Sequence, residues 1–278
     1  MALLSYVVLQ FKKWKNNICV ILSFILLLIL CMTVTKEYIE YAESMEFTIG
    51  VFEPFILMFT QKYALISITL IFLLLFHDVP FLDSNTPYAL IRGKRAIWVL
   101  GQLLYIFLSV IIFITFALTA CICIGFRFAY LGNIWSETAW FTANGGALNQ
   151  SSPIPLILIQ KTTQFYSVLW IYILTILSVT VITFVLFIFN LWKGKYYGLG
   201  AVAVLIFSGY ITILEKLKES GLWFSVIGHA NLAYHSFDKG GQTPTVMHSV
   251  ILMLAIIAVC CIGAWYISKE YVFFREVK

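Results

Sequence analysis

The sequence reads Ile18-Cys-Val-Ile-Leu-Ser-Phe-Ile-Leu-Leu-Leu-Ile-Leu-Cys-Met-Thr-Val34, an unbroken apolar stretch that decides the fold class of the chain. A helix needs about 20 such residues to cross the roughly 30 Å of hydrocarbon in a bilayer. Outward from this stretch, five more apolar runs fall at about 56–76, 97–122, 166–191, 196–214 and 246–267. The sequence therefore predicts six membrane spans, the first at about 18–34.

The composition points to the same class. Hydrophobic residues make up 62% of the 278 residues and charged residues 11%, whereas an average soluble domain has about 45–50% and about 25%. None of the connectors between the runs reaches the roughly 50 residues of a small compact domain. We therefore predict an all-α integral membrane protein, a single transmembrane domain over 1–278 without a soluble nucleotide-binding domain.

Basic residues set the expected orientation. With both termini in the cytoplasm, the inner segments carry eleven of the 18 Lys and Arg and four of the 13 Asp and Glu. This excess of positive charge inside is the usual bias of membrane proteins. We expect a multi-pass protein of the cell membrane with cytoplasmic N- and C-termini. Because the basic residues are scattered over short loops, a nucleic-acid partner is not expected.

The second run contains a charge that leaves its start open. Lys62 lies in its early part. Either the helix begins near Tyr63 and continues through His77, or the lysine extends its amine toward the outer face.

The six cysteines all lie inside or at the ends of apolar runs, where thiols behave as small hydrophobes. The Cys121-x-Cys123 pair has no second pair at the spacing that a metal site requires. We therefore expect neither a disulfide framework nor a metal site.

The segment before the first span has the pattern of an interfacial helix. Leu4, Val7, Phe11 and Trp14 recur at helical spacing, while lysines fall on the other faces. A helix over 4–17 would lie flat on the inner leaflet. The alternative is an ordinary basic flank that only fixes the orientation.

The inner loop after the second span contains residues that are typical of the start and the end of a short helix. Thr86 is a plausible N-cap, Pro87 suits the first helical position, and Gly93 suits the position after the last turn. The resulting helix of about six residues, roughly 9 Å long, would end in basic residues. It is either a rigid element that receives force from a partner, or a tight turn with positive-inside charges.

Two outer segments are also predicted. Residues 35–54 carry glutamates at intervals of three and predict a short acidic amphipathic helix with a solvated charged face. Leu222 to Ile227 is too short for a span and too apolar for a solvated loop, so we expect a re-entrant or interfacial piece. Irregular backbone at membrane depth requires protein or a water-filled cavity to satisfy it.

The sequence lacks several kinds of chemistry. No GxxxxGK[ST] phosphate loop is present, and the spans hold almost no ionisable residues of the kind that proton or sodium relays need. Catalytic residues are not expected, and we do not predict an enzyme. His77-Asp78 is either an acid–base pair at the inner surface or an ordinary interfacial histidine beside an acid.

This layout resembles the permease subunit of a type-2 ATP-binding-cassette exporter of bacteria. The resemblance covers a basic helix before the first span, six spans with inner termini, a short inner helix between spans two and three, and Gly221-Leu-Trp-Phe-Ser-Val-Ile-Gly-His-Ala-Asn-Leu-Ala-Tyr-His-Ser-Phe237 before the last span. The long 127–165 outer loop departs from the family's pattern.

The resemblance implies roles for three groups of residues. The elbow helix would contain Phe11, Lys12, Lys13, Trp14 and Lys15. The coupling helix between 83 and 95 would dock on a separate ATPase through Asp83, Thr86, Pro87, Tyr88, Arg92, Lys94 and Arg95. An outer gate would include Trp223, Phe224, His229 and His235.

The family also implies the partners and the activity. The chain would move a peptide, lipid or drug-like substrate outward, using ATP and Mg bound by a separate ATPase subunit. A second permease chain and membrane lipid would complete the assembly, with no cofactor on this chain. The alternatives are a membrane enzyme or immunity protein that acts without an ATPase, and a sensor that binds a ligand through its outer loops.

Overall fold

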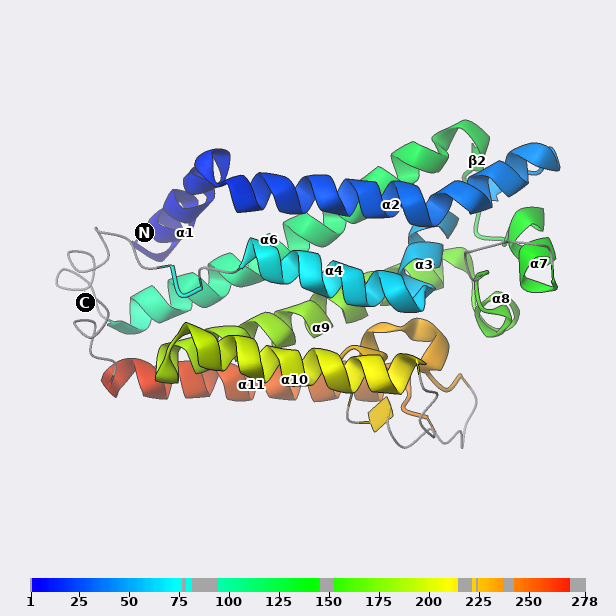
Figure 1. The fold of residues 1–278 in the computed structure, drawn as a ribbon. Coiled ribbons are helices and arrows are strands. Elements are labelled where there is room, and N and C mark those ends of the chain that lie inside the picture. Colours follow the sequence, from blue (N-terminus) through cyan, green and yellow to red (C-terminus); the bar gives the residue numbers. More distant parts are fainter. Residues whose placement is uncertain are drawn as a thin grey trace.

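The computed structural model describes residues 2–76, 79–81, 95–145, 153–214, 222–223, 225–237 and 243–270, and these form a bundle of long helices (Figure 1). The long helices are α2 (Ile18–Ser44), α4 (Lys62–Leu75), α6 (Arg95–Gly125), α9 (Gln164–Lys193), α10 (Lys195–Leu214) and α11 (Val246–Glu270). Shorter helices and strands join them: α1 (Ala2–Lys12), η1 (Lys13–Asn16), β1 (Ile49–Gly50), α3 (Glu53–Thr60), η2 (Phe126–Phe128), β2 (Ala129–Tyr130), α7 (Glu137–Ala143), α8 (Leu156–Lys161), η4 (Gly228–Ala230) and η5 (Leu232–Tyr234).

The helical membrane character expected from the sequence is confirmed. Four helices of the described residues, α2, α6, α9 and α11, are long and apolar enough to cross a membrane. The pair α3 and α4 adds a fifth crossing if the two count as one span. The described apolar part of α10, Tyr196–Ile211, is shorter than these. The number of six spans therefore stays a prediction.

The first long helix extends further than expected. Asn17 caps its start by accepting a hydrogen bond from the Cys19 amide at 3.0 Å, and the helix ends only at Ser44. The separate acidic helix predicted over 35–54 is wrong, because its first ten residues continue α2. No glycine or proline interrupts this stretch, and the chain turns at Glu46, whose φ is 57°.

The second run is broken rather than continuous. The predicted helix over 56–76 is divided into α3 and α4, which meet at an angle of 86°. Gln61 between them has an extended backbone, and the Thr60 hydroxyl donates back to the Ile56 carbonyl at 2.9 Å. Helix α4 begins at Lys62, close to the first of the two alternatives for this run. All eight residues of α3 are buried.

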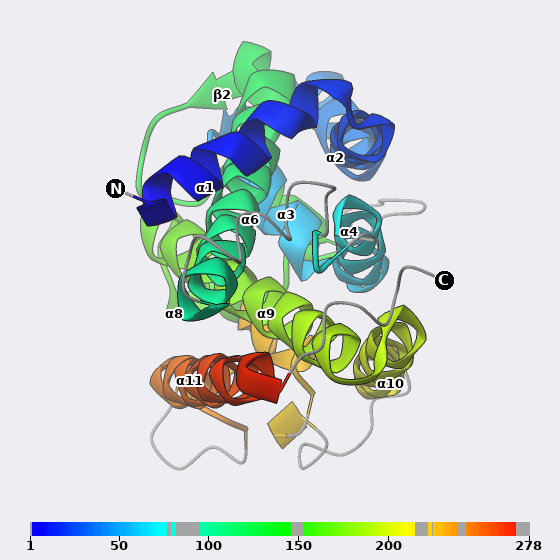
Figure 2. The same ribbon diagram turned by 90° about the vertical axis from the view of Figure 1, so that its left-hand side faces the viewer.

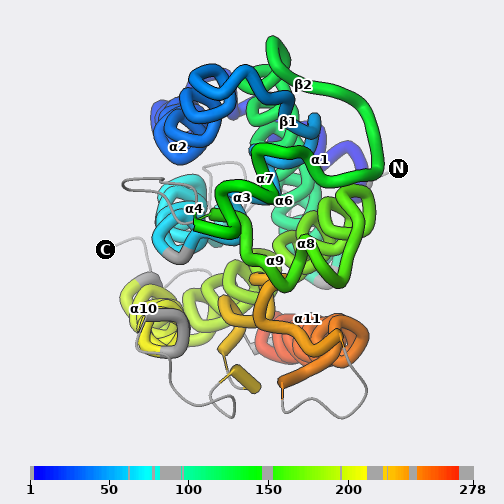
Figure 3. The backbone as a smooth tube through the Cα atoms, turned by 90° about the vertical axis from the view of Figure 1, so that its right-hand side faces the viewer, coloured from blue at the N-terminus to red at the C-terminus, as the bar shows by residue number. Residues whose placement is uncertain are grey.

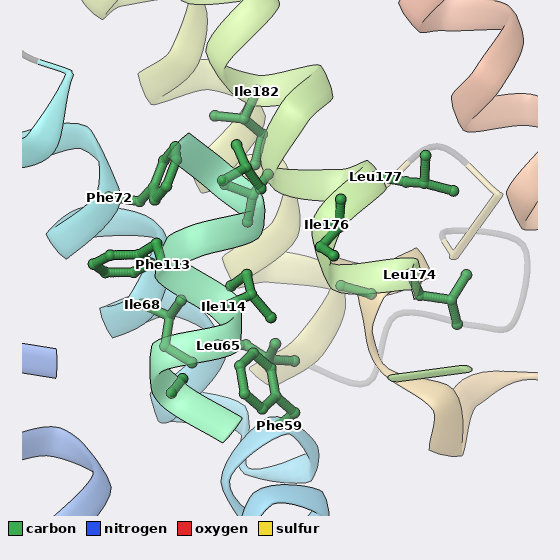
Figure 4. Close-up of a cluster of buried hydrophobic side chains, with 14 of the residues drawn as sticks. Phe59, Leu65, Ile68, Phe72, Phe113, Ile114, Leu174, Ile176, Leu177 and Ile182 are labelled. Atoms are coloured by element: carbon green, nitrogen blue, oxygen red, sulfur yellow. The ribbon is translucent and has the colours of Figure 1, made fainter. Parts of the chain in front are cut away.

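Helix α9 is the centre of the packing. It packs most extensively against α10 and α11, and it lies between them when the bundle is viewed along its length (Figure 2). On its other side, helix α2 packs against both α4 and α6. Figure 4 shows part of the shared core, where Phe72 of α4, Phe113 of α6 and Ile182 of α9 are all buried. Burying an aromatic or aliphatic side chain of this size contributes about 1.5–3 kcal/mol.

Helix α1 packs on the first turns of α6. The Gln102 amide donates to the Tyr6 hydroxyl at 2.6 Å, and a side chain at Gly101 would meet the Tyr6 ring at 2.6 Å. The Trp14 indole donates to the Tyr105 hydroxyl at 2.5 Å. Of the apolar residues that predicted an interfacial helix, Leu4 is 65% exposed whereas Val7 is buried. The helix before the first span thus exists, and its place on the inner leaflet stays a prediction.

Candidate functional site

Polar side chains gather at one end of the bundle, which we call the distal end. It holds α3, α7, α8, η4 and η5, and lies opposite the end that holds α1 (Figure 1). Viewed from this side, the segment 225–237 crosses the distal end between α10 and α11 (Figure 3). Two hydrogen-bonded clusters lie here, one around Glu53 and one around Ser249.

The carboxylate of Glu53 is fully buried at the start of α3. Its Oε2 accepts hydrogen bonds from the Tyr38 hydroxyl at 2.9 Å, the Gly50 amide at 2.8 Å and the Ser136 hydroxyl at 2.6 Å. Its Oε1 accepts from the Ser136 amide at 2.8 Å and the Gln164 side chain at 2.7 Å. These five neutral donors compensate for the cost of removing a carboxylate from water.

This first cluster fixes the distal end because its members come from separate elements. Tyr38 lies on α2, Gly50 on β1, Ser136 caps α7 and Gln164 opens α9. Strand β1 pairs in parallel with β2, which brings Tyr130 beside Gly50. Burial, followed by the charge of Glu53, raises the pKa of Tyr130 to about 12. Glu53 therefore connects segments more than a hundred residues apart.

The second cluster joins two histidines to one serine. The Ser249 hydroxyl lies 2.8 Å from His229 Nδ1 and 2.8 Å from His235 Nε2. Ser249 stands in the first turn of α11, whereas the histidines belong to the preceding segment. All three side chains are buried. The contacts attach the segment 225–237 to the last helix.

The hydrogen bonds around the two neutral rings cannot all form at once. His235 Nδ1 lies 3.1 Å from the Asn231 carbonyl and His229 Nε2 lies 3.3 Å from the Trp223 carbonyl, and both carbonyls can only accept. The Ser249 hydroxyl also lies 3.3 Å from the Thr245 carbonyl. Two neutral rings and one hydroxyl thus supply three protons for five contacts.

The environment keeps both rings neutral. Burial, followed by the charge of His229, lowers the pKa of His235 to about 4. Burial also lowers the pKa of His229, and His248 acts in the same direction, while the Trp223 carbonyl raises it.

The segment 225–237 is held on its other sides as well. The Ser178 hydroxyl of α9 donates to the Val226 carbonyl at 3.0 Å, and the Asn231 amide donates to the Thr60 carbonyl at the end of α3 at 3.3 Å. A side chain at Gly209 of α10 would meet Ile227 Cβ at 2.9 Å. The expected irregular piece before the last span is thus buried among four helices, and its described backbone is supported by side chains.

The structure brings part of the predicted outer gate together. His229 and His235 meet at Ser249, and the Trp223 ring packs edge-on against His248 with ring centres 4.7 Å apart. Phe224 lies outside the described residues. Among the predicted elbow residues, Phe11 packs against Trp14, and Lys13 donates to Gln10 at 3.2 Å. Lys12 and Lys15 are exposed.

Most of the predicted coupling helix is outside the described part of the chain. This applies to Asp83, Thr86, Pro87, Tyr88, Arg92 and Lys94, and also to the His77-Asp78 pair. Arg95 is described, and it opens α6 with an exposed side chain. The role of these residues at an ATPase stays a prediction.

Sequence reasoning missed the residues that organise the distal end. Glu53 entered only as one of the outer charges, although an acid followed by Pro54 within an apolar run indicates the start of a buried helix. Ser136, Gln164 and Ser249 gave no signal, because their partners are distant in sequence. Among the described residues, no group of three or more His, Cys, Asp or Glu is placed to hold a metal ion.

No family model matches the chain, and neither a curated protein nor a solved structure matches it.

Proposed function

We propose that the chain is the membrane-spanning permease subunit of an ATP-binding-cassette exporter. It would move a peptide, lipid or drug-like substrate outward, together with a second permease chain and a separate ATPase that binds ATP and Mg. The observation that best supports this proposal is the largely buried segment 225–237 between α10 and α11, in which the short 3₁₀ helices η4 and η5 alternate with irregular backbone. Irregular backbone in an apolar bundle is typical of a transport path.

The segment 225–237 is held by a few hydrogen bonds of the strength expected for a gate that closes and opens. Side-chain hydrogen bonds tie it to three neighbours, through Ser249 of α11, Thr60 of α3 and Ser178 of α9. Each such bond contributes about 0.5–1.5 kcal/mol. Releasing the segment therefore costs a few kcal/mol, an amount that a conformational cycle driven by ATP can supply. The gate would open when α11 moves relative to α3 and α9.

The energy source would act at the opposite end. The short loop helix over 83–95 would transmit the movement of the ATPase to α4 and α6, the helices that flank it in the sequence. Because the spans offer almost no titratable groups for ion coupling, a soluble partner is the simplest driver. The membrane surface and the elbow residues Phe11 to Lys15 would anchor the first span.

The test is purification of the tagged full-length chain from its native membrane. We expect an ATPase of about 25–35 kDa, the size of one or two compact domains, to co-purify and hydrolyse ATP. Arg92→Glu and Tyr88→Ala should abolish this association. Lys36→Ala is the matched control, because Lys36 is exposed and pairs with the equally exposed Glu40 at 3.7 Å.

The same variants separate the alternatives. A chain that purifies without an ATPase, and whose cellular effect survives Arg92→Glu, would overturn the proposal. A membrane enzyme that uses the His77-Asp78 pair would lose its activity with His77→Ala. A sensor would bind its ligand through the outer loops without ATP-dependent flux.

A further inference from the structure

Three sulfur atoms from three elements meet in the core of the bundle. The Cys31 thiol of α2 donates to Met58 Sδ of α3 at 3.5 Å, and the Cys121 thiol of α6 donates to the same atom at 3.7 Å. The two thiols thus share one acceptor, the Met58 thioether. All three side chains are fully buried. The described part of the chain therefore contains a buried cluster of three soft donor atoms.

The spacing of these atoms suits a shared metal ion. Two sulfurs about 3.6 Å apart can each lie about 2.3 Å from one ion, a normal metal–sulfur distance, with an angle of about 100° at the metal. That angle is between those of tetrahedral and trigonal sites. The three side chains come from helices that already pack together, so the ligands are arranged before the ion arrives.

We propose that Cys31, Met58 and Cys121 form a binding site for a soft monovalent metal ion of the copper(I) class. Thiolate and thioether ligands select copper(I) over harder ions. Zinc prefers four ligands of greater charge, and the triad provides three sulfurs, one of them a neutral thioether. The proposal does not depend on the function proposed above.

Charge balance favours a monovalent ion. The buried site cannot hold net charge without a large desolvation cost. If one thiol loses its proton to solvent as the ion binds, the resulting thiolate, the remaining thiol, the thioether and the ion have a net charge of zero. No electron is transferred. One proton should therefore be released for each ion bound.

The alternative is that the three side chains only pack as small hydrophobes. In that case the thiols and the thioether would contribute to the core without any affinity for metal. The sequence favoured this view, since the Cys121-x-Cys123 pair showed no partner. The structure supplies the missing partner, because Cys31 lies 90 residues away in the sequence yet contacts the same Met58 sulfur as Cys121.

The experiment loads the full-length chain with copper(I) in detergent, without oxygen and against a chromophoric copper(I) chelator. We expect about one ion per chain and about one proton released per ion. X-ray absorption at the copper edge should show three sulfur neighbours at about 2.3 Å. Silver(I) should occupy the same site as a redox-inert substitute.

Variants identify the ligands. Cys31→Ala combined with Cys121→Ala should abolish binding, and Met58→Leu, which nearly conserves volume, should reduce the sulfur neighbours from three to two. Cys260→Ala with Cys261→Ala is the matched control, since it removes two neighbouring thiols from α11. This control should still bind one ion.

The proposal is overturned if the wild-type chain takes no copper(I) from the chelator. It is equally overturned if Met58→Leu leaves the copper spectrum unchanged, or if the α11 control loses the ion. Because Met58→Leu changes no thiol and little volume, its result remains decisive even if the double cysteine variant does not fold.

Discussion

Gln164 donates its side-chain amide to the Glu53 carboxylate at 2.7 Å, joining the first residue of α9 to the first residue of α3. The two residues are 111 positions apart in the sequence. Their contact positions the central helix of the bundle against the broken second run. The buried carboxylate thus determines how the distal end is assembled.

Replacing Glu53 with glutamine should destabilise the protein strongly. The side-chain amide would turn an NH₂ group toward donors such as the Ser136 amide and the Gln164 side chain, which then lose their acceptor. We expect a loss of about 3 kcal/mol in the free energy of unfolding, since bonds to charged groups contribute about 1.5–3 kcal/mol. Unfolding in detergent, followed by circular dichroism, measures this change.

The control for this substitution is Glu40→Gln. Glu40 forms an exposed pair with Lys36 on α2, and surface pairs of this kind contribute about 0.5 kcal/mol or less. Equal stability losses in the two variants would contradict a special role for Glu53.

Gly50→Ala should disturb the same cluster by a steric clash, without changing any charge. A Cβ at Gly50 would lie 1.9 Å from the Gln164 side-chain nitrogen, so Gln164 must leave Glu53 or β1 must move away. Either movement costs at least one buried hydrogen bond, and we expect a loss of about 1–3 kcal/mol. Thermal unfolding of the purified chain detects it.

Gly263→Ala is the matched glycine variant. This residue lies within α11, and a Cβ there would meet no atom within 4 Å. Alanine favours a helix over glycine by about 1 kcal/mol, so this variant should be as stable as the parent or more so. If Gly263→Ala lost stability while Gly50→Ala kept it, close packing between Gly50 and Gln164 would not stabilise the distal end.

The long apolar helices could be predicted from the sequence because each carries its own signal. Hydrophobic length alone places α2, α6, α9 and α11 within about ten residues of their observed bounds. Lys62 also marked the point where the second run breaks. The first helix continues ten residues past the apolar stretch that ends at Val34, because a helix can extend beyond the apolar run until a residue such as Glu46 turns the chain.

The candidate site could be predicted only in part. His229 and His235 were singled out by their position before the last span, but Ser249 between them lies inside an apolar run and looks like an ordinary helix residue. Glu53 was counted only among the outer charges, because its burial depends on partners such as Tyr38 and Gln164 that only the tertiary fold brings together. Contacts between distant residues leave no local pattern.

Tyr6→Phe should loosen α1 from the bundle. The Tyr6 hydroxyl accepts the Gln102 amide hydrogen bond, and Gln102 is fully buried. Its amide would lose this acceptor, although it still donates to the Phe81 carbonyl at 3.1 Å. We expect a loss of about 1 kcal/mol and faster hydrogen exchange in α1. Tyr63→Phe, at a side chain that is 70% exposed, should leave the exchange unchanged.

Acidification should weaken the attachment of the segment 225–237 to α11. The pKa of His235 is lowered from its ordinary 6.5 to about 4, and that of His229 is lowered too. Between pH 6.5 and about 4 the released rings bind protons that the buried rings do not. The closed arrangement is therefore fully stable above about pH 6.5 and loses stability as the pH falls, by at most about 1.4 kcal/mol per pH unit for each ring.

The measurement is hydrogen exchange of 225–237 between pH 4 and 7.5, corrected for the intrinsic pH dependence of exchange. His235→Gln keeps an acceptor for the Ser249 hydroxyl but cannot titrate, so its protection should vary less with pH than that of the parent. The control is His248→Gln, which removes an exposed histidine beside Trp223 and should retain most of the pH dependence. If protection instead increased on acidification, a proton bound at His229 or His235 would stabilise the closed segment, which would contradict the lowered pKa values of both rings.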